Sequence, residues 1–426
     1  MANSTNDGGK IRTDLLVIGG GITGLTAAIE AAEAGAGAVI VEKNPYLGGR
    51  VAQLYQYFPK LCPPTCGLEI NFRRIRDQKD NIKIFVDSEV TKIEGESGSY
   101  TVTIKQTPRF INGNCTACGD CEKACTTEID NEFNFGMDKH KAVYLPHEVA
   151  FPAKYVLKKD ACSDDELKKI KDSCQYNAVD LDMTEKEITV ECSTITVSTG
   201  WKPYEAEKIE NLGFGTNKNI ITNMMMERLA SPNGPTKGKI LKPSDAGEVS
   251  SVAFVQCAGS RDENHLKYCS AVCCLASMKQ ATYVRDQYPE ADIHMFYIDV
   301  RSPGRLEDFY MKRQDDEKLF FHRGKVAKIV ESGSKLTVKA ENTLTNEMQE
   351  VTVDMAVLAT GMVPSASNGD IPADVTKDEF GFMVPGVDPK SGIIAAGTAT
   401  RPLEVSGSIQ DATGAAVEVL KAMARR

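Results

Sequence analysis

The N-terminal part of the chain alternates short apolar runs with glycine-rich and charged positions. The runs Asp14–Ile18 and Ala38–Val41 have the length and composition of buried strands. Between them, an alanine-rich stretch from about 25 to 34 has the composition of a helix. The order strand, helix, strand predicts a βαβ unit in a parallel sheet.

Further strand-like runs outline the rest of the chain. They lie at 82–86, 100–104, 186–190, 195–197, 252–256 and 356–358. Two of them lead into Thr-Gly turns, at Gly200 and Gly361, where we expect the chain to cross between two nucleotide-type domains. The predicted domains are a first domain over 10–107, 186–201 and 365–426, an insert over 108–185, and a second domain over 202–364.

Composition narrows the function classes. The chain has 426 residues, 42% of them hydrophobic, and a formal net charge of −9, which argues against a nucleic-acid partner. Residues 1–14 contain no apolar leader, and the apolar stretch 15–41 is broken by glycines, Glu30 and Glu33, so we expect neither secretion nor a membrane span. Thirteen cysteines in such a chain favour metal or redox chemistry over a disulfide framework. The five histidines form no motif, and no acid–base constellation is visible.

The first predicted strand runs into the motif Gly19-Gly-Gly21-Ile-Thr-Gly24. In a βαβ unit the first glycine allows a tight turn, the second lets backbone amides approach a pyrophosphate, and the third lets helix and strand pack closely. Glu42, eighteen residues past Gly24, is placed to bind a ribose hydroxyl. The alternative is a βαβ unit that binds no nucleotide.

Later motifs favour FAD over NAD. Gly48-Gly49-Arg50 follows the acidic residue, as in flavoproteins with two dinucleotide-binding domains. Ser88-Glu-Val90 stands where such proteins make a backbone contact to adenine, and Gly397-Thr398 resembles their third flavin motif, with Thr in place of the usual Asp. Ser408-Ile-Gln410 is expected to open the last helix, with its N-terminus toward the flavin ring. The residues predicted to bind FAD are Gly19, Gly21, Ile22, Thr23, Gly24, Glu42, Lys43, Gly49, Arg50, Val90, Thr199, Gly200, Gly397, Thr398, Ser408, Ile409 and Gln410.

The second domain lacks the glycine motif that a nicotinamide site would need. Its first strand, 252–256, continues instead into a block that contains Cys257, Cys269, Cys273 and Cys274. These four cysteines could hold an iron–sulfur cluster, although the spacing is not that of a ferredoxin. A redox disulfide, or a core position for one of the two adjacent cysteines, is the alternative.

The run Cys115-x2-Cys118-x2-Cys121-x3-Cys125 has the spacing with which bacterial ferredoxins hold [4Fe–4S] clusters. A zinc site or coincidence is the alternative, but zinc sites usually pair two Cys-x2-Cys units that lie apart. Taken alone, the run predicts four ligands to one cluster.

Together, the flavin motifs, the inserted run and the Cys257 block resemble the A subunit of heterodisulfide reductase over nearly the whole chain. The shorter length more closely resembles the A subunit of the quinone-interacting membrane-bound oxidoreductase complex of sulfate reducers. The resemblance implies an α/β flavoprotein of the thioredoxin reductase type, with two dinucleotide-binding domains and an inserted ferredoxin-like domain. It also implies a cluster on Cys257, Cys269, Cys273 and Cys274 close to FAD, and Lys279 beside the flavin ring, where a cation favours anionic reduced flavin. Without the resemblance, Lys279 reads as a surface lysine on a helix.

In two-cluster ferredoxins, the fourth cysteine of each run binds the cluster whose other three ligands come from the other run. The segment Cys162–Cys174 ends like a second run, but a charged, helix-like stretch, 165–171, replaces its two middle ligands. We therefore expect one cluster on Cys115, Cys118, Cys121 and Cys174. Cys125 and Cys162 are left as a disulfide or as free thiols. The role of Cys62 and Cys66 is left open: they could be a redox pair, cluster ligands or part of a structural turn. Cys192 is expected in the core.

The resulting expectation is a flavin-dependent iron–sulfur oxidoreductase subunit with one FAD and two [4Fe–4S] clusters. By resemblance, it would transfer electrons between the menaquinone pool and adenylylsulfate reductase in sulfate respiration. Its partners would be a second A-like flavin and iron–sulfur subunit together with a quinone-interacting haem membrane subunit, at the cytoplasmic face of the inner membrane. The alternatives are a heterodisulfide reductase subunit that acts on thiol coenzymes, an NAD(P)H-dependent flavin disulfide reductase, and a scaffold subunit that has lost flavin.

Overall fold

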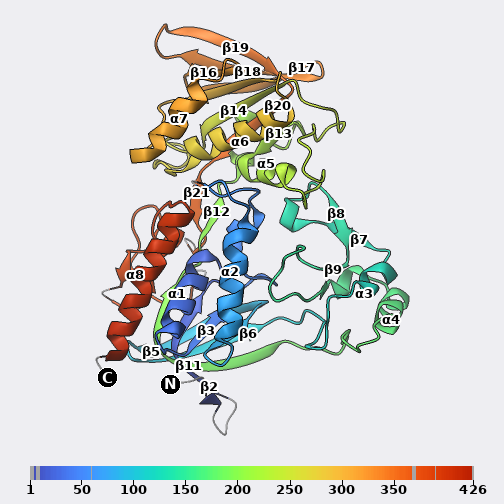
Figure 1. Ribbon diagram of the computed structural model, residues 1–426, viewed down its shortest axis with the longest axis vertical. Coiled ribbons are helices and arrows are strands. Elements are labelled where there is room, and N and C mark those ends of the chain that lie inside the picture. The colour runs from blue at the N-terminus through green and yellow to red at the C-terminus, as the bar shows by residue number, and fades with distance from the viewer. Residues whose placement is uncertain (1–3, 6–9, 59, 367–370, 389, 425–426) are drawn as a thin grey trace.

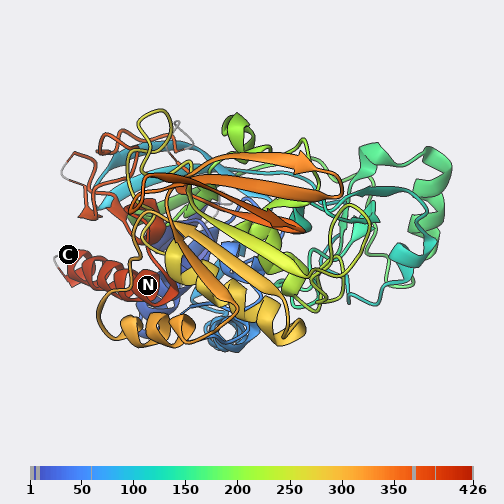
Figure 2. The same ribbon diagram turned by 90° about the horizontal axis from the view of Figure 1, so that it is seen from above.

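The computed structural model describes residues 4–5, 10–58, 60–366, 371–388 and 390–424. Most of the N-terminal segment, in which the sequence shows no apolar leader, lies outside the described residues. Three regions are visible in Figure 1, with the first domain at the lower left, the second domain at the top, and the insert, in teal, at the right. Figure 2 shows the insert projecting to one side of the other two regions.

The first domain is built on a mainly parallel sheet. Its strands follow the order β22 (Gly386–Val387), β23 (Ile394–Ala395), β11 (Lys186–Val197), β2 (Ile11–Ile18), β3 (Ala38–Val41) and β4 (Ile82–Phe85). The helices of this domain are α1 (Ile22–Glu33), α2 (Pro64–Asp77) and α8 (Val405–Ala424). The hairpin β5 (Ser88–Glu96) and β6 (Ser99–Gln106) joins the sheet because β6 pairs antiparallel with β11.

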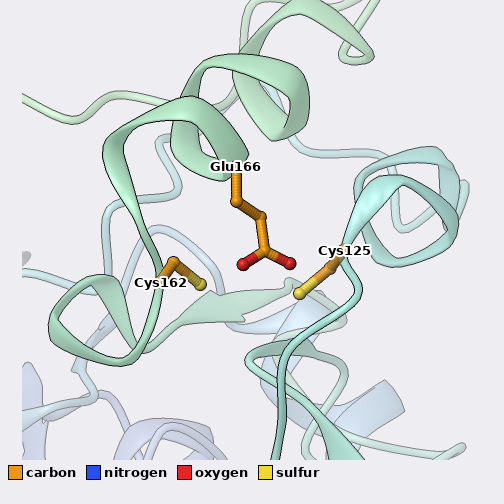
Figure 3. A group of neighbouring side chains, drawn as sticks. All are labelled: Cys125, Cys162 and Glu166. Carbon is orange, nitrogen blue, oxygen red and sulfur yellow. The ribbon is translucent and has the colours of Figure 1, made fainter.

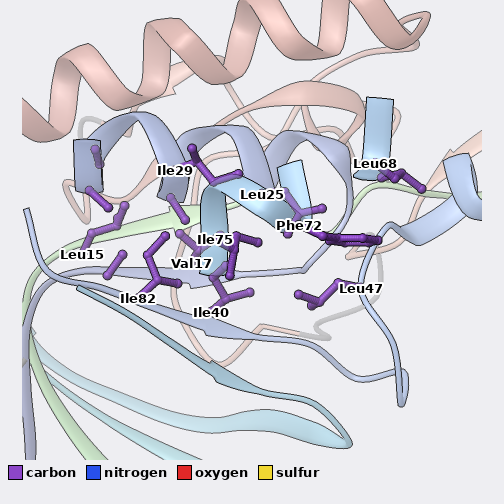
Figure 4. Packing of buried hydrophobic residues seen from close by; sticks show 14 of the residues in the cluster. Leu15, Val17, Leu25, Ile29, Ile40, Leu47, Leu68, Phe72, Ile75 and Ile82 are labelled. Carbon is purple, nitrogen blue, oxygen red and sulfur yellow. The ribbon is translucent and has the colours of Figure 1, made fainter. Parts of the chain in front are cut away.

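The core of the first domain lies between this sheet and its helices (Figure 4). Leu15 and Val17 of β2 pack with Leu25 and Ile29 of α1, and all four side chains have no exposed surface. Phe72 of α2 belongs to the same cluster. Burial of such side chains contributes about 1.5–3 kcal/mol each, which explains why these apolar runs form the central elements.

One expected detail of this sheet is wrong. The sequence suggests two separate strands near 186–190 and 195–197, whereas β11 is one strand of 12 residues. The polar residues between the two apolar runs do not break it, because β6 pairs with its first half and β2 with its second half. β11 thus leads directly from the end of the insert to the Thr199-Gly200 turn.

The insert lies between β6 and β11 and has little regular structure. It contains two small antiparallel pairs and two short helices. These elements are α3 (Asp120–Ala124), β7 (Glu128–Asp130), β8 (Lys139–Lys141), β9 (Val143–Tyr144), β10 (Val156–Leu157) and α4 (Asp164–Asp172). The last, α4, contains the charged stretch that the sequence places between Cys162 and Cys174.

The second domain has a parallel sheet of its own, in the order β13 (Ile220–Thr222), β20 (Met355–Thr360), β14 (Ser251–Ala258), β15 (Asp292–Tyr297) and β16 (Leu319–Arg323). Its helices are α5 (Asn223–Ala230), α6 (Cys273–Gln287) and α7 (Glu307–Gln314). A separate antiparallel sheet is made of β17 (Val326–Ser332), β18 (Lys335–Asn342) and β19 (Glu347–Val353). The chain enters and leaves through the antiparallel pair β12 (Trp201–Pro203) and β21 (Met362–Pro364).

A buried guanidinium connects the three regions. Arg228 of α5 has 1% of its surface exposed. It donates hydrogen bonds to Oδ1 of Asn134 in the insert, at 2.8 Å, and to the carbonyl oxygen of Gln53 in the first domain, at 3.3 Å. Its guanidinium also lies 4.6 Å from the ring centroid of Phe133.

Candidate functional site

A cavity of about 780 Å³ opens where the three regions meet. Parallel strands of the first domain explain its position, because the turns after the carboxyl ends of β2, β3 and β11 meet at one edge of the sheet. Most of the predicted FAD-binding residues line it. They are Gly19, Gly21, Ile22, Thr23, Glu42, Lys43, Gly49, Arg50, Val90, Thr199, Gly200, Thr398 and Ser408.

The glycines of the first motif have distinct geometries. Gly19 has a φ of +106°, and a Cβ there would lie 2.5 Å from the carbonyl oxygen of Ser198. A Cβ on Gly24 would lie 1.9 Å from the carbonyl oxygen of Gly19, so this position packs helix against strand and does not line the cavity. Gly21 has only Gly49 within 4 Å of such a Cβ. Close packing therefore requires glycine at positions 19 and 24, whereas the space around Gly21 is open.

The carboxylate of Glu42 is buried at the end of β3. Its Oε2 accepts a hydrogen bond from the Gly20 amide at 2.6 Å, and its Oε1 accepts from the amide and side chain of Asn44, each at 2.8 Å. Burial raises the pKa of Glu42, and these hydrogen bonds oppose that shift. The carboxylate thus braces the glycine turn while it lines the cavity.

Two residues that line the cavity carry a buried polar atom without a hydrogen-bond partner in the protein. These atoms are Thr199 Oγ1 and Gln280 Oε1, and neither takes part in a hydrogen bond within the protein. Unpaired buried polar atoms are rare in proteins and call for a ligand or water. The volume also lies within the range of about 300–1,000 Å³ that is usual for ligand pockets. These observations fit a bound dinucleotide.

The C-terminal part of the predicted flavin site differs from expectation. Helix α8 begins at Val405, so Ser408 lies in its first turn and does not open it. The helix starts earlier because the Glu404 carboxylate accepts hydrogen bonds from the amides of Ser406, at 2.5 Å, and Gly407, at 2.6 Å. Ile409, Gln410 and Gly397 are not among the residues that line the cavity.

Lys279 lies in α6 and lines the cavity with its side chain almost fully buried, not on the surface. Its Nζ lies 2.8 Å from Oε1 of Glu227 in α5 and also donates to the carbonyl oxygen of Gln56. Glu227 accepts further hydrogen bonds from the Gln280 side chain, at 2.6 Å, and the Tyr55 amide, at 3.0 Å. The cation expected beside the flavin is therefore part of a buried ion pair.

The four cysteines of the second domain come together at one end of its sheet. Cys257 lies at the end of β14 with a φ of +56°, and Cys273 and Cys274 begin α6. Burial and the neighbouring thiols, that of Cys274 foremost, raise the pKa of Cys257 to about 11. Burial and the same group of thiols, including Cys269, raise the pKa of Cys273. Such thiols become thiolates only when a cation or cluster binds them.

Two features of this cysteine group bear on its chemistry. Among the described residues, no three of these sulfur atoms lie within 4.8 Å of one another, as the ligands of a single ion would. The ion pair of Arg261 and Asp299, at 2.6 Å, lies beside them, and Cys274 Sγ contacts the Asp299 carbonyl oxygen at 3.7 Å. Cys273 also lines the large cavity. The arrangement suits a group larger than one ion, next to the candidate flavin site.

In the insert, Cys115, Cys118, Cys121 and Cys174 line one small cavity. Left-handed residues, Ala117 at a φ of +58° and Gly119 at +87°, turn the chain between the first three cysteines. Burial and the thiols of Cys115 and Cys174 raise the pKa of Cys121 to about 12. Here too, no three of the sulfur atoms lie within 4.8 Å of one another. The structure thus brings together the four residues that the ferredoxin pattern selects and leaves Cys125 out.

Cys125 lies instead beside Cys162 and Glu166 (Figure 3), and the ligand atoms of these three residues all lie within 4.8 Å of one another. The remaining cysteines lie elsewhere. Cys62 and Cys66 do not line the large cavity, and Cys66 is exposed on α2. Cys192 is buried in the core of the first domain. Within the described part of the chain, no helix is long and apolar enough to cross a bilayer.

Sequence reasoning missed three carboxylates: Glu227, Glu404 and Glu166. Glu227 offered a signal, since it is the single acidic residue in the helix Asn223–Ala230, whose other residues are mostly apolar. Glu166 stands in a run of charged residues, and Glu404 lies in a short loop segment before the last helix, so nothing in the local pattern marks either residue.

Comparison with solved structures establishes the fold. The chain aligns over 97% of its length with thioredoxin reductase from T. acidophilum, at a TM-score of 0.53 and 15% identity, covering 99% of that chain. It aligns over the same share with the bacillithiol disulfide reductase of Bacillus cereus, at a TM-score of 0.54 and 12% identity, covering all of that chain. The expected two-dinucleotide-domain architecture of the thioredoxin reductase type is confirmed.

Sequence comparison gives the relatives. Residues 14–67 match the family model for FAD dependent oxidoreductases. The chain is 37% identical over 417 residues to the A subunit of the H(2):CoB-CoM heterodisulfide,ferredoxin reductase of Methanothermobacter marburgensis, an alignment that spans 94% of this chain and 62% of the relative. It is 34% identical over 432 residues to the iron-sulfur A subunit of the CoB–CoM heterodisulfide reductase of Methanocaldococcus jannaschii, with 98% and 65% covered. The chain spans about three fifths of the length of these relatives, and its sequence places it among the homologues of the A subunit of heterodisulfide reductase.

Proposed function

We propose that this chain is an electron-transfer subunit of a redox complex, with FAD in the large cavity and two [4Fe–4S] clusters. One cluster is held by Cys257, Cys269, Cys273 and Cys274, and the other by Cys115, Cys118, Cys121 and Cys174. The observation that carries the proposal is that Cys273 lines the same cavity as the flavin-motif residues Gly21, Thr199 and Thr398. A flavin and a cluster in these places would be direct neighbours.

The protein's own groups have separate roles in this proposal. The amides at the start of α1 bind the pyrophosphate, and Glu42 holds the glycine turn that presents them. FAD supplies a carrier that exchanges one or two electrons, whereas each cluster exchanges one. The Lys279–Glu227 pair sets the electrostatic field in the cavity, and Arg261 offsets the charge of the cysteine ligands.

A direct reaction with NAD(P)H is disfavoured. At the end of β14, the position of a nicotinamide-binding glycine loop is taken by Cys257 and Gly259, and a Cβ on Gly259 would lie 2.7 Å from the Tyr204 side chain. The backbone there is packed against side chains and is not open to a pyrophosphate. Rapid bleaching of the flavin by NADH or NADPH in the isolated protein would contradict this assignment.

The partners are proposed from resemblance alone. We propose a complex at the cytoplasmic membrane face with a second A-like flavin and iron–sulfur subunit together with a quinone-interacting haem subunit, which transfers electrons between menaquinone and adenylylsulfate reductase. The names of the relatives favour an alternative, a heterodisulfide reductase that acts on thiol coenzymes. Purification of the native complex decides between them, because the first requires haem and a quinone-reactive subunit, and the second a thiol-dependent reductase subunit.

Cofactor content tests the proposal directly. We expect about eight iron and one FAD per chain, from two clusters of four iron each. Cys257→Ser should remove about four iron and keep FAD. Cys192→Ala, a buried cysteine away from both cysteine groups, serves as the control and should keep all eight. Only about four iron in the wild-type protein, or a Cys257→Ser variant with unchanged iron, would refute the second-domain cluster.

A further inference from the structure

The insert contains a second cluster of potential metal ligands on the other side of α3 and α4. Cys121 lies within α3 and Cys125 directly follows it, while Cys162 precedes α4 and Cys174 follows it. Each helix thus connects the candidate iron–sulfur site with the group Cys125, Cys162 and Glu166. Figure 3 shows the two sulfur atoms pointing toward the Glu166 carboxylate from opposite sides.

The group is too small for a cubane but suits one ion. Its two sulfur atoms and a carboxylate oxygen lie within 4.8 Å of one another. A tetrahedral zinc ion, with bonds of about 2.3 Å to sulfur and 2.0–2.2 Å to oxygen, places its ligands about 3.6–3.8 Å apart. Small rotations of the side chains would therefore close the site.

Neighbouring groups hold the carboxylate in place. Glu166 Oε1 accepts hydrogen bonds from the Thr127 amide, at 2.8 Å, and from the amide and hydroxyl of Thr126, and Oε2 accepts one from the Thr127 hydroxyl at 2.6 Å. Oε2 therefore keeps a free lone pair. Such fixation by surrounding groups is typical of metal ligands, whose orientation determines affinity. Ser163 caps the helix, with its hydroxyl accepting from the Glu166 amide, and so fixes the backbone as well.

Burial also suits a bound cation. Cys125 and Glu166 are 3% and 8% exposed, so a cation held by them would be shielded from bulk water, and its charge would be balanced by the carboxylate and by the thiolates that form when it binds. The ammonium of Lys141 lies near but pairs with Glu128 at 2.9 Å. Thiolate ligands select zinc over magnesium or calcium.

We propose that Cys125, Cys162 and Glu166 bind one zinc ion, with water as the fourth ligand. The ion joins the end of α3 to the start of α4, in the place where a two-cluster ferredoxin would hold its second cluster. It is a redox-silent crosslink that supports the two helices from which Cys121 and Cys174 reach the first cluster.

The test uses the holoprotein, produced with zinc in the medium. Elemental analysis should find about one zinc per chain besides the iron, and X-ray absorption at the zinc edge should show two sulfur neighbours at about 2.3 Å and two lighter ones. Cys162→Ser should lower zinc retention during dialysis against a chelator by about tenfold or more, and Glu166→Gln by about tenfold, as for other ligand and supporting-group changes. Asp165→Asn removes an exposed carboxylate from the same turn and should retain zinc.

Other results would overturn the proposal. The proposal fails if the wild-type protein contains no zinc, or if Cys162→Ser retains zinc as well as the wild type does. It also fails if Cys162→Ser loses about four iron, because that loss would reveal a second cluster. A mass two hydrogens lower, carried by a peptide linking Cys125 and Cys162, would show a disulfide instead. Zinc binding here does not depend on flavin or electron transfer, so its failure and that of the proposed function are distinguishable.

Discussion

Lys279 Nζ lies 2.8 Å from Glu227 Oε1, and the two side chains are 3% and 2% exposed. The pair bridges α5 and α6 at the wall of the cavity that we assign to FAD. A lone lysine there would favour the negative charge of reduced flavin, whereas the pair is neutral overall. In the proposed site, the two residues together would tune the potential of the flavin.

Glu227→Gln should raise the midpoint potential of the flavin, because Lys279 then acts as an uncompensated cation. A change of about 1–3 kcal/mol corresponds to a rise of about 20–60 mV for a two-electron couple. Spectroelectrochemical titration measures it. Lys279→Met should shift the potential the opposite way, and the double variant should lie close to wild type. An unchanged potential in both single variants would show that the pair does not act on the flavin.

The same pair should matter for folding. Lys279→Met leaves the Glu227 carboxylate buried without its partner, which costs about 3–5 kcal/mol of unfolding free energy. Removal of both charges, in Lys279→Met with Glu227→Met, should recover much of that loss. Urea unfolding followed by circular dichroism compares the variants. A double variant less stable than either single one would contradict the expectation.

Gly24→Ala should abolish FAD retention, because the new methyl group would lie 1.9 Å from the Gly19 carbonyl oxygen and push α1 away from β2. Gly414→Ala is a matched control, since this glycine lies within α8 and has nothing within 4 Å of the added Cβ. The control should keep FAD and gain up to about 1 kcal/mol of helix stability. Flavin absorbance after gel filtration reports both outcomes, and a Gly24→Ala protein with full FAD would refute the packing argument.

Cys174→Ser and Cys125→Ser separate two ways of assigning the ferredoxin run. Cys174 lines the cavity shared with Cys115, Cys118 and Cys121, whereas Cys125 does not. Cys174→Ser should therefore lose about four iron and Cys125→Ser should lose none. Iron analysis of the two purified variants decides, and the opposite result would restore the simple four-ligand run.

The carboxyl group of Asp354 gives a prediction for the pH dependence of stability. Burial alone would raise the pKa of its carboxyl, but hydrogen bonds from the hydroxyl and amide of Ser250 and the charge of Lys335 lower it to about 2. Because the folded pKa lies below the unfolded value of about 3.9, the carboxylate stabilises the fold fully above about pH 5 and progressively less as the pH falls toward 2. Asp354→Asn should cost about 1–3 kcal/mol at pH 7.

The stability difference between wild type and Asp354→Asn should be the same at pH 7 and pH 5, and should shrink only at lower pH. Denaturant unfolding at several pH values measures it. Ser332→Ala, on the exposed edge of the neighbouring antiparallel sheet, controls for substitution in this domain. A difference that grows as the pH falls would contradict the hydrogen-bonded assignment.

The sequence predicts this molecule best where one local pattern determines the structure. The Gly19–Gly24 turn and its strands follow from apolar runs and glycine spacing, and the choice of Cys174 over Cys125 follows from the symmetry of ferredoxin runs. Both depend on interactions close in the sequence or on a strict repeat.

Long-range pairing and electrostatics are not predictable in this way. Lys279 meets Glu227 only because α5 and α6 pack together, and Glu166 reaches Thr127 only after the insert folds. β11 continues through polar residues because two neighbouring strands satisfy its backbone. In each case the partner lies far along the chain, and no local pattern in the sequence pairs the two positions.

Arg228 has a consequence for how such a protein would work. Separating the second domain from the other two would break the contacts of the Arg228 guanidinium with Gln53, Asn134 and Phe133. Hydrogen bonds to charged groups contribute about 1.5–3 kcal/mol each, so these contacts favour the arrangement of the three regions seen here. Turnover through this chain would be set by fixed gaps between its redox centres, and its rate should be insensitive to solvent viscosity, unlike that of an enzyme whose domains must swing.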